Sequence, residues 1–270
     1  DYLDNDENDV YSSHKLTLKL IKTLGQQTYN SETWDLMLKN VYSLGVVSFP
    51  GDIIYKTLHV SHPFNNLELS YHIRILNYGE LTDASEDFEA NEQSVNFSIL
   101  QNNDNDFTLG ASIDYLFSWI GEYRQSAFIY NIGFIKFFYN NKLSMGCSLE
   151  DYVHTLENFS NIENDISWDI KISSHFNPSH APYKLFFDYI YHNKHDDAVI
   201  IALDLNIDNH VSILLGKNLY LADGDGSNTL LSNFGVGTRI KVKESIINIG
   251  IQYLDNGVIS IGSGLTTQFK

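Results

Sequence analysis

Strict alternation of side-chain character along the chain is the feature that most constrains its fold. In the stretch LELSYHIRILNYGELTD at 67–83, bulky apolar side chains occupy one parity and polar or charged side chains occupy the other. The apolar set is Leu67, Leu69, Tyr71, Ile73 and Ile75, and the polar set is Glu68, Ser70, His72 and Arg74. Because successive side chains of a strand point to opposite faces of its sheet, this pattern predicts a strand with one apolar and one polar face.

The same period of two recurs along the sequence, whereas helical periodicity is scarce. Alternating runs lie at 164–174, 199–208, 232–243, 245–254 and 257–269, and further candidate strands lie at 14–24, 40–49, 52–61, 94–101, 107–118, 126–138, 143–152, 182–192 and 210–221. The segment 25–39 is less regular and allows a short capped helical turn or a loop. Breaks rich in Asn, Asp and Gly separate the runs without any composition shift, so we expect one all-β domain over 1–270 with antiparallel neighbours.

The length of these runs favours a barrel that crosses a membrane. Soluble strands are most often about 5 or 6 residues long, whereas strands tilted across a bilayer need about 9 to 11. We therefore expect a transmembrane antiparallel β-barrel of roughly 14 strands, in which the apolar parity faces acyl chains and Glu68, His72 and Arg74 face the lumen. A large soluble antiparallel sheet with one solvated face is the alternative for the same pattern.

Composition excludes several classes of protein. The chain has 270 residues and a formal net charge of −17, which argues against a nucleic-acid partner, because phosphate neutralisation needs clustered Lys and Arg. Cys147 is the single cysteine, so an internal disulfide and a thiolate metal cluster are excluded. No apolar run reaches the length of a membrane-spanning helix. The sequence begins at Asp1 without a basic and apolar leader, and we expect a signal peptide that was removed or lies upstream.

Motifs that would indicate catalysis or a metal site are weak in this sequence. The histidines His175, His180, His192 and His195 lack the spacing of a metal site, and we expect them in loops or the lumen. Asp223 and Asp225 alternate with glycines as in calcium loops but lack the acidic residue that completes an EF-hand, which makes them a weak metal candidate beside a plain loop. No nucleophile motif or phosphate-binding loop is present, so we expect a non-enzymatic protein with no cofactor.

Glycine and aromatic spacing between 67 and 192 resembles a known family. The segments are Asn77–Glu80, Leu109–Ser112, Tyr123, Asn131–Gly133 and Met145–Leu149, followed by FNPSHAPYKLFFDYI at 176–190. Their order resembles the PorV/PorQ family of FadL-like outer-membrane barrels in the type IX secretion system, and the segment at 177–190 favours the PorQ branch. The N-terminal Asn-Pro-Ala element of that family is missing here, so the chain is either truncated or a divergent member.

The resemblance implies a non-enzymatic part of the machinery for protein secretion and cell-surface attachment. Its implied location is the outer membrane, and its implied partners are outer-membrane lipid, secretion proteins of PorZ or PorU type and secreted cargo. Two other functions stay open. One is a FadL-like transporter of hydrophobic small molecules, which would need an apolar pocket inside the barrel and a lateral opening, and the other is a secreted soluble β-sandwich that binds a partner.

Candidate contact residues lie in two predicted corners. Tyr78, Gly79 and Glu80 form the first, and Asn177, His180 and Pro182 belong to the second, each expected to be a structural corner first and a partner contact second. The acidic stretch DASEDFEANE at 83–92 is expected to be a loop whose negative field attracts cationic surfaces or divalent ions, or which simply solubilises the chain.

Overall fold

The alternating runs form a closed antiparallel β-barrel. The computed structural model describes residues 40–82, 87–103, 107–139, 142–157, 167–178, 181–194, 196–220, 233–254 and 258–269. The strands are β1 (Asn40–Ser48), β2 (Ile54–Phe64), β3 (Leu67–Thr82), β4 (Asp87–Asn103), β5 (Phe107–Ile120), β6 (Tyr123–Phe138), β7 (Leu143–Glu157), β8 (Asp169–Phe176), β9 (Tyr183–His192), β10 (Ala198–Asn206), β11 (Val211–Tyr220), β12 (Phe234–Val242), β13 (Ser245–Tyr253) and β14 (Ile259–Phe269).

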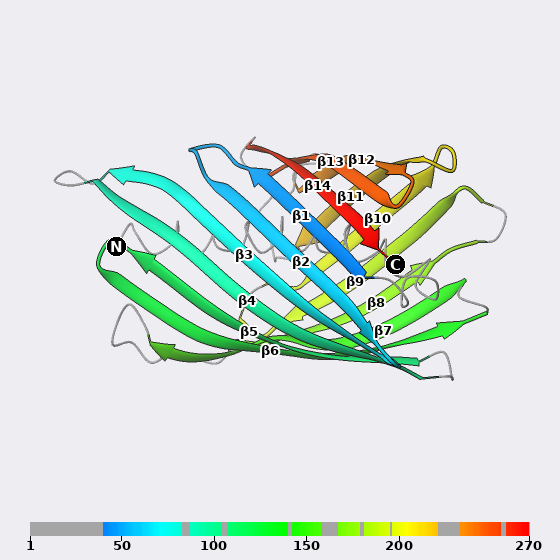
Figure 1. The fold of residues 1–270 in the computed structure, drawn as a ribbon, viewed down its shortest axis with the longest axis horizontal. Helices are drawn as coiled ribbons and strands as arrows, with labels where there is room; N and C mark the ends of the chain where they lie inside the picture. Colours follow the sequence, from blue (N-terminus) through cyan, green and yellow to red (C-terminus); the bar gives the residue numbers. More distant parts are fainter. Residues whose placement is uncertain are drawn as a thin grey trace.

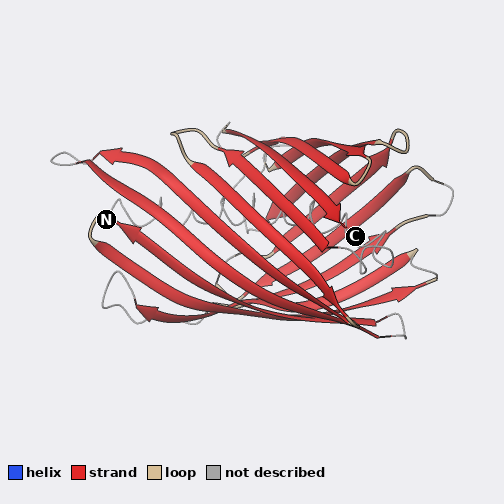
Figure 2. Cartoon of the chain, viewed as in Figure 1, coloured by secondary structure: helices blue, strands red, loops and turns tan. Residues whose placement is uncertain are grey.

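Each strand pairs with its neighbours in chain order, and the last strand closes the barrel on the first. β14 pairs with β1 over the register from Asn40 opposite Phe269 to Ser48 opposite Ile261. The strands run obliquely round the barrel (Figure 1), and the described elements are strands joined by loops and turns (Figure 2). Closure satisfies the backbone hydrogen bonds of every strand without leaving a sheet edge.

Tight hairpins fix the register of neighbouring strands. Three two-residue connections begin with a residue of positive φ: Asn65 at +57° after β2, Gly121 at +56° after β5 and Lys243 at +55° after β12. A positive φ at the first turn residue matches the right-handed twist of the strands that the turn connects. These hairpins therefore fix which residues of the two strands lie opposite each other, so that the apolar side chains of both strands share one face.

Connections at the two ends of the barrel differ in length. The end that carries Asn40 and Phe269 has the connections 65–66, 104–106, 139–142, 177–182, 207–210 and 243–244, and we call it the short-turn end. The opposite end, which we call the long-loop end, includes the connections 158–168 and 221–233. β3 to β7 are 14 to 17 residues long, which exceeds the length that a bilayer requires.

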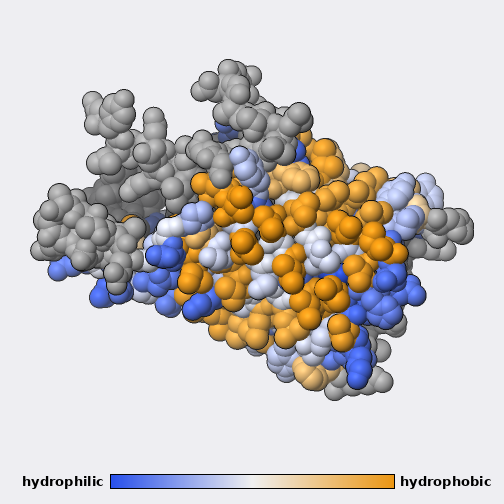
Figure 3. Space-filling model, turned by 90° about the horizontal axis from the view of Figure 1, so that it is seen from above, coloured by the Kyte–Doolittle hydropathy of each residue, from blue (hydrophilic) through white to orange (hydrophobic). Residues whose placement is uncertain are grey.

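Apolar side chains cover the outside of the barrel, and polar side chains point inward. Tyr71 and Ile73 are 51% and 39% exposed, whereas Glu68 on the other parity of β3 is 8% exposed. Figure 3 shows a broad apolar surface with hydrophilic residues gathered towards its two ends. The predicted assignment of the two faces of this strand is therefore confirmed.

The structure confirms the all-β antiparallel barrel, and its closure excludes an open sheet with one solvated face. The predicted acidic loop at 83–92 is wrong in part, because β4 begins at Asp87 and Asp87 pairs with Thr82 across the hairpin. The candidate strand at 14–24 and the segment 25–39 lie outside the described residues, and a single domain over 1–270 stays a prediction. Among the described residues, no helix is long and apolar enough to cross a membrane.

Candidate functional site in the barrel interior

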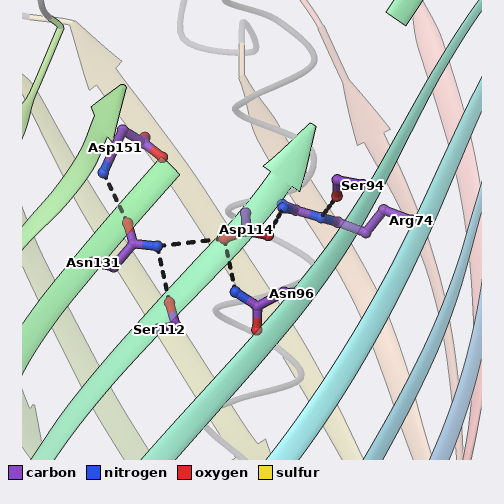
Figure 4. A network of polar contacts seen from close by, with 7 residues as sticks. All are labelled: Arg74, Ser94, Asn96, Ser112, Asp114, Asn131 and Asp151. Atoms are coloured by element: carbon purple, nitrogen blue, oxygen red, sulfur yellow. Dashed lines mark hydrogen bonds and ion pairs between the residues drawn. The ribbon is translucent and has the colours of Figure 1, made fainter. Parts of the chain in front are cut away.

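A network of polar side chains crosses the inner wall from β3 to β7, and Asp114 lies at its centre. Arg74 pairs with Asp114 Oδ1, and Asn96 Nδ2 donates to Asp114 Oδ2 at 2.7 Å. Arg74 Nε also donates to Ser94 Oγ at 2.6 Å. Figure 4 shows these side chains converging on Asp114 from neighbouring strands. The Asp114 side chain is only 4% exposed, so its charge depends on these partners rather than on water.

A β-bulge extends this network to β7. Asn131 Nδ2 donates to Ser112 Oγ at 3.0 Å, and Asn131 Oδ1 accepts from the backbone N–H of Asp151 at 2.8 Å (Figure 4). Asp151 has φ of +55°, and the β6–β7 register shifts beside it between Tyr130 and Ile132. The Asn131 amide therefore stabilises a left-handed non-glycine residue at the bulge.

Two ion pairs and one histidine–carboxylate contact line the wall from β8 to β12. Arg239 Nη1 donates to Asp204 Oδ2 at 2.7 Å, Lys171 Nζ lies 3.2 Å from Asp188 Oδ2, and His192 Nδ1 lies 2.8 Å from Asp169 Oδ1. The carboxylates Asp169, Asp188 and Asp204 are all buried. Charge is thus compensated locally around this part of the interior, as a low-dielectric site requires.

Other inward-facing histidines pack against rings. His175 stacks on Phe186 with ring centroids 4.5 Å apart, and His59 meets His72 edge to face at 5.8 Å. His175 and His192 lie on the inner wall, which is one of the two placements expected for them, whereas His180 and His195 lie outside the described residues. Within the part of the chain that the structure describes, no three His, Cys, Asp or Glu side chains converge as metal ligands.

Apolar packing inside the barrel is confined to small clusters. The main cluster comprises Val47, Phe49, Tyr55, Leu76 and Leu254 and lies where β1, β2, β3 and β13 reach the long-loop end. Much of the remaining buried inner wall is polar, with serine, asparagine and aspartate side chains on β3 to β11. The described interior therefore lacks a continuous apolar path.

Several buried polar atoms of the inner wall have no hydrogen-bond partner among the described residues. They include His175 Nε2, Asp204 Oδ1, Asn218 Oδ1, Asn248 Oδ1 and Gln252 Nε2. Unpartnered buried polar groups are uncommon in native proteins, because each one keeps the penalty of desolvation. Those on β10, β11 and β13 gather on one part of the wall.

The first predicted contact corner lies inside a strand and not in a loop. Tyr78, Gly79 and the backbone of Glu80 belong to β3, at a bulge where the β3–β4 register shifts. Gly79 has φ of +77° and donates its N–H to Asn77 Oδ1 at 2.7 Å. A Cβ at Gly79 would lie 3.3 Å from the Gly51 carbonyl, so this glycine allows the 49–53 connection to approach closely. The side chain of Glu80 lies outside what the structure describes.

The second predicted corner lies at the opposite end of the barrel. Asn177 and Pro182 belong to the connection after β8 at the short-turn end, where Asn177 N donates to the Lys142 carbonyl and Asn206 N donates to the Pro182 carbonyl, both at 2.7 Å. The structure therefore does not bring the two predicted corners together. His180, Asp223 and Asp225 lie outside the described residues, so their predicted roles stay predictions.

The interior pairings could not be found from the sequence alone. The polar parity correctly placed Glu68 and Arg74 on the inner wall. Their partners depend on strand register, which alternation alone does not specify. Asp204 and Asn131 also stand in the sequence as polar residues between two outward-facing apolar residues, which indicates an inward position. Their neighbours in the sequence do not reveal that Asp204 pairs with Arg239 or that Asn131 bonds to Asp151.

Comparison with solved structures shows the fold, while comparisons with family models and with curated proteins find no match. CymD, a monoaromatic hydrocarbon channel, matches with a TM-score of 0.65 at 9% identity, over 86% of this chain and 88% of that chain. The toluene transporter TbuX of Ralstonia pickettii matches with a TM-score of 0.58 at 9% identity, over 86% and 89% of the two chains. The P. putida toluene transporter TodX matches with a TM-score of 0.55 at 8% identity, over 85% and 89%.

These similarities concern architecture. At such low identity they establish that the chain has the closed 14-strand antiparallel fold of FadL-like outer-membrane barrels. The three matched proteins are described as channels or transporters. They do not establish the finer resemblance to PorV or PorQ.

Proposed function

We propose that the chain spans an outer membrane as a FadL-like barrel and conducts small molecules through its interior. The observation that carries this proposal is the closed 14-strand barrel, which matches a hydrocarbon channel over 86% of the chain. The apolar surface in Figure 3 supports insertion into lipid, because outward apolar side chains then leave water. By the usual rule for such barrels, the short-turn end faces the periplasm and the long-loop end faces the outside.

The polar interior argues against a hydrophobic solute for this chain. Arg74, Asp114, Asp204 and Arg239 are paired on the inner wall, and the apolar cluster of the long-loop end does not extend along it. A solute with hydrogen-bonding groups suits such a wall better than an aromatic hydrocarbon, because it replaces the water that it displaces. We therefore do not propose that this chain conducts the hydrocarbons named for CymD, TbuX and TodX.

Liposome swelling tests conduction directly. The full chain, folded into phosphatidylcholine liposomes, should accelerate swelling in iso-osmotic glycerol or glucose relative to empty liposomes, and heat-denatured chain should not. Unheated samples that migrate as compact barrels but cause neither swelling nor toluene uptake would refute the proposal.

A second candidate is a PorQ-like role in type IX secretion. It is supported by the resemblance between 67 and 192, and these residues correspond to β3–β9. The long strands β3 to β7 and the polar interior suit a barrel that works through protein contacts rather than through an apolar channel. Co-expression with PorZ-like and PorU-like proteins should then give a complex that survives affinity purification in detergent. Purification of the barrel alone under those conditions would rule this role out.

A further inference from the structure

A contiguous patch of glycines covers part of the inner wall. The glycine patch consists of Gly45, Gly216, Gly235, Gly237, Gly250, Gly262 and Gly264, from the adjacent strands β11 to β14 and β1. Gly216 lies opposite Gly235, Gly237 opposite Gly250, Gly250 opposite Gly262, and Gly264 opposite Gly45. Alternation places these residues on the inner face, since the flanking Val46, Val236, Ile249 and Ile261 are exposed on the outside.

Neither packing nor backbone conformation explains the glycines at the centre of this patch. A Cβ at Gly250 would lie no closer than 3.4 Å to any neighbour, and a Cβ at Gly264 would meet only the Leu44 carbonyl, also at 3.4 Å. Both are ordinary van der Waals distances, and neither residue has a positive φ. Alanine would fit at these two positions, so packing does not require glycine there. Elsewhere in the patch packing is tighter, since a Cβ would lie 2.8 Å from Thr57 Oγ1 at Gly45 and 3.1 Å from the Ile249 carbonyl at Gly237.

Unpartnered polar groups surround the patch. Gln252 lies between Gly235 and Ser260, and Asn248 lies between Gly264 and Arg239, so each amide has a glycine on one neighbouring strand and a polar residue on the other. Gln252 Nε2, Asn248 Oδ1 and Asn218 Oδ1 lack partners among the described residues, and Gln252 is only 5% exposed. Buried amide atoms that lie beside glycines and lack a protein partner indicate that a further molecule supplies their hydrogen bonds.

The fourth group is a carboxylate whose charge is already compensated. Asp204 Oδ2 accepts from Arg239, and Lys184 is the cross-strand neighbour of Asp204 on β9, but Asp204 Oδ1 has no partner among the described residues. One compensated carboxylate and three amides can accept and donate hydrogen bonds without demanding a full charge on the ligand. Hydroxyl groups, which donate and accept at once, match this set.

We infer that the glycine patch is a binding site for a polyhydroxylated small molecule such as a sugar or a polyol. The exposed backbone of the glycine patch contacts the face of the sugar ring or polyol chain. The side chains of Asp204, Asn218, Asn248 and Gln252 bind the hydroxyl groups of the ligand. This inference rests on the proposed function, since the solute reaches the patch through the conducting interior, and it names the class of that solute.

Saturation-transfer NMR on the full chain in detergent tests the site with D-glucose and myo-inositol as probes and toluene as the comparison. Both polyols should receive saturation in the folded protein. The variants Gln252→Leu and Gly250→Val, which remove a polar group and add bulk within the glycine patch, should each weaken glucose binding at least tenfold. Ser173→Val is the control: it enlarges an inward-facing side chain on β8, away from the patch, and should leave binding unchanged.

Compact migration of the unheated variants verifies that each of them folds. Absence of saturation transfer to both polyols, or unchanged binding in Gln252→Leu and Gly250→Val, would overturn the site. Glucose binding without liposome swelling would support the site and refute conduction, whereas swelling without any polyol binding would support conduction and refute the site.

Discussion

At the scale of single residues, the Arg74–Asp114 pair shows how much the barrel depends on compensated charge. The two side chains are 22% and 4% exposed, so each charge is largely removed from water. Replacing Asp114 with Leu removes the carboxylate that pairs with Arg74 and accepts from Asn96, and leaves the Arg74 guanidinium only its neutral acceptor Ser94. We predict a loss of about 3 kcal/mol in the free energy of unfolding, because an uncompensated buried charge is more costly than an absent pair.

Urea unfolding in detergent, followed by tryptophan fluorescence, measures this loss. Ser112→Ala is the matched control on β5: it removes one hydrogen bond of the same network and no charge, and should have a smaller effect. The double variant Arg74→Met with Asp114→Leu should recover much of the stability. A double variant no more stable than Asp114→Leu would contradict the charge argument.

Two glycines of the inner wall should respond differently to the same substitution. A Cβ at Gly146 would lie 2.9 Å from the Phe134 carbonyl and 3.1 Å from Ile135 Cγ1, whereas a Cβ at Gly264 meets its nearest atom at 3.4 Å. Gly146→Ala should therefore destabilise the barrel by about 1–3 kcal/mol through overpacking, and Gly264→Ala should be nearly neutral. The same urea titration compares them, and equal effects would show that wall packing does not distinguish the two sites.

At the scale of the element, local alternation predicted most strands, and non-local contacts set the details it missed. Parity identified the two faces of β3 correctly, because it needs no knowledge of neighbours. The bulge at Tyr78–Glu80 was predicted as a corner because a Tyr-Gly-Glu sequence is compatible with either structure, and the approach of Gly51 to Gly79 is a tertiary contact. Asp87 was predicted in a loop because its acidic surroundings obscure the hairpin pairing with Thr82.

The turn between β10 and β11 provides a prediction for a single element. The backbone N–H groups of His210 and Val211 donate to Asp208 Oδ1 at 2.6 and 2.8 Å. These hydrogen bonds lower the pKa of the Asp208 carboxyl below its usual value. A carboxyl with a lowered pKa in the folded state stabilises the turn above its unfolded pKa, and this contribution disappears as the pH falls through the folded value.

Hydrogen exchange at the amides of His210 and Val211 measures this effect. Protection should be present at neutral pH and should decrease as Asp208 is protonated under acidic conditions. Asp208→Ala should show weak protection at every pH, and Asp208→Asn, which keeps an acceptor without the charge, should lose the acid dependence. Acid-independent protection in the unsubstituted chain would contradict the role given to this carboxylate.

At the scale of the whole molecule, the candidate site was predictable only in outline. Alternation indicates which residues face inward, but the glycine patch needs the register of five strands. In the sequence, Gly235 and Gly237 are simply two glycines within the alternating run at 232–243. Only the pairing of Gly216 with Gly235 and of Gly237 with Gly250 shows that they belong to one continuous surface.

The apolar side chains on the outside of the barrel provide a prediction that distinguishes a membrane barrel from a soluble one. Ile249 is 51% exposed in the middle of β13, whereas Ser245 begins the same strand at the short-turn end. In a bilayer, Ile249→Arg should lower the free energy of unfolding by about 2–4 kcal/mol and Ser245→Arg by about 0–1 kcal/mol, because the cost of a charge falls from the bilayer midplane to the interface. Urea unfolding in phosphatidylcholine vesicles measures both values. In water an exposed isoleucine is replaced by arginine at little cost, so a negligible effect of Ile249→Arg in vesicles would place this face in solvent and reject the membrane-spanning barrel.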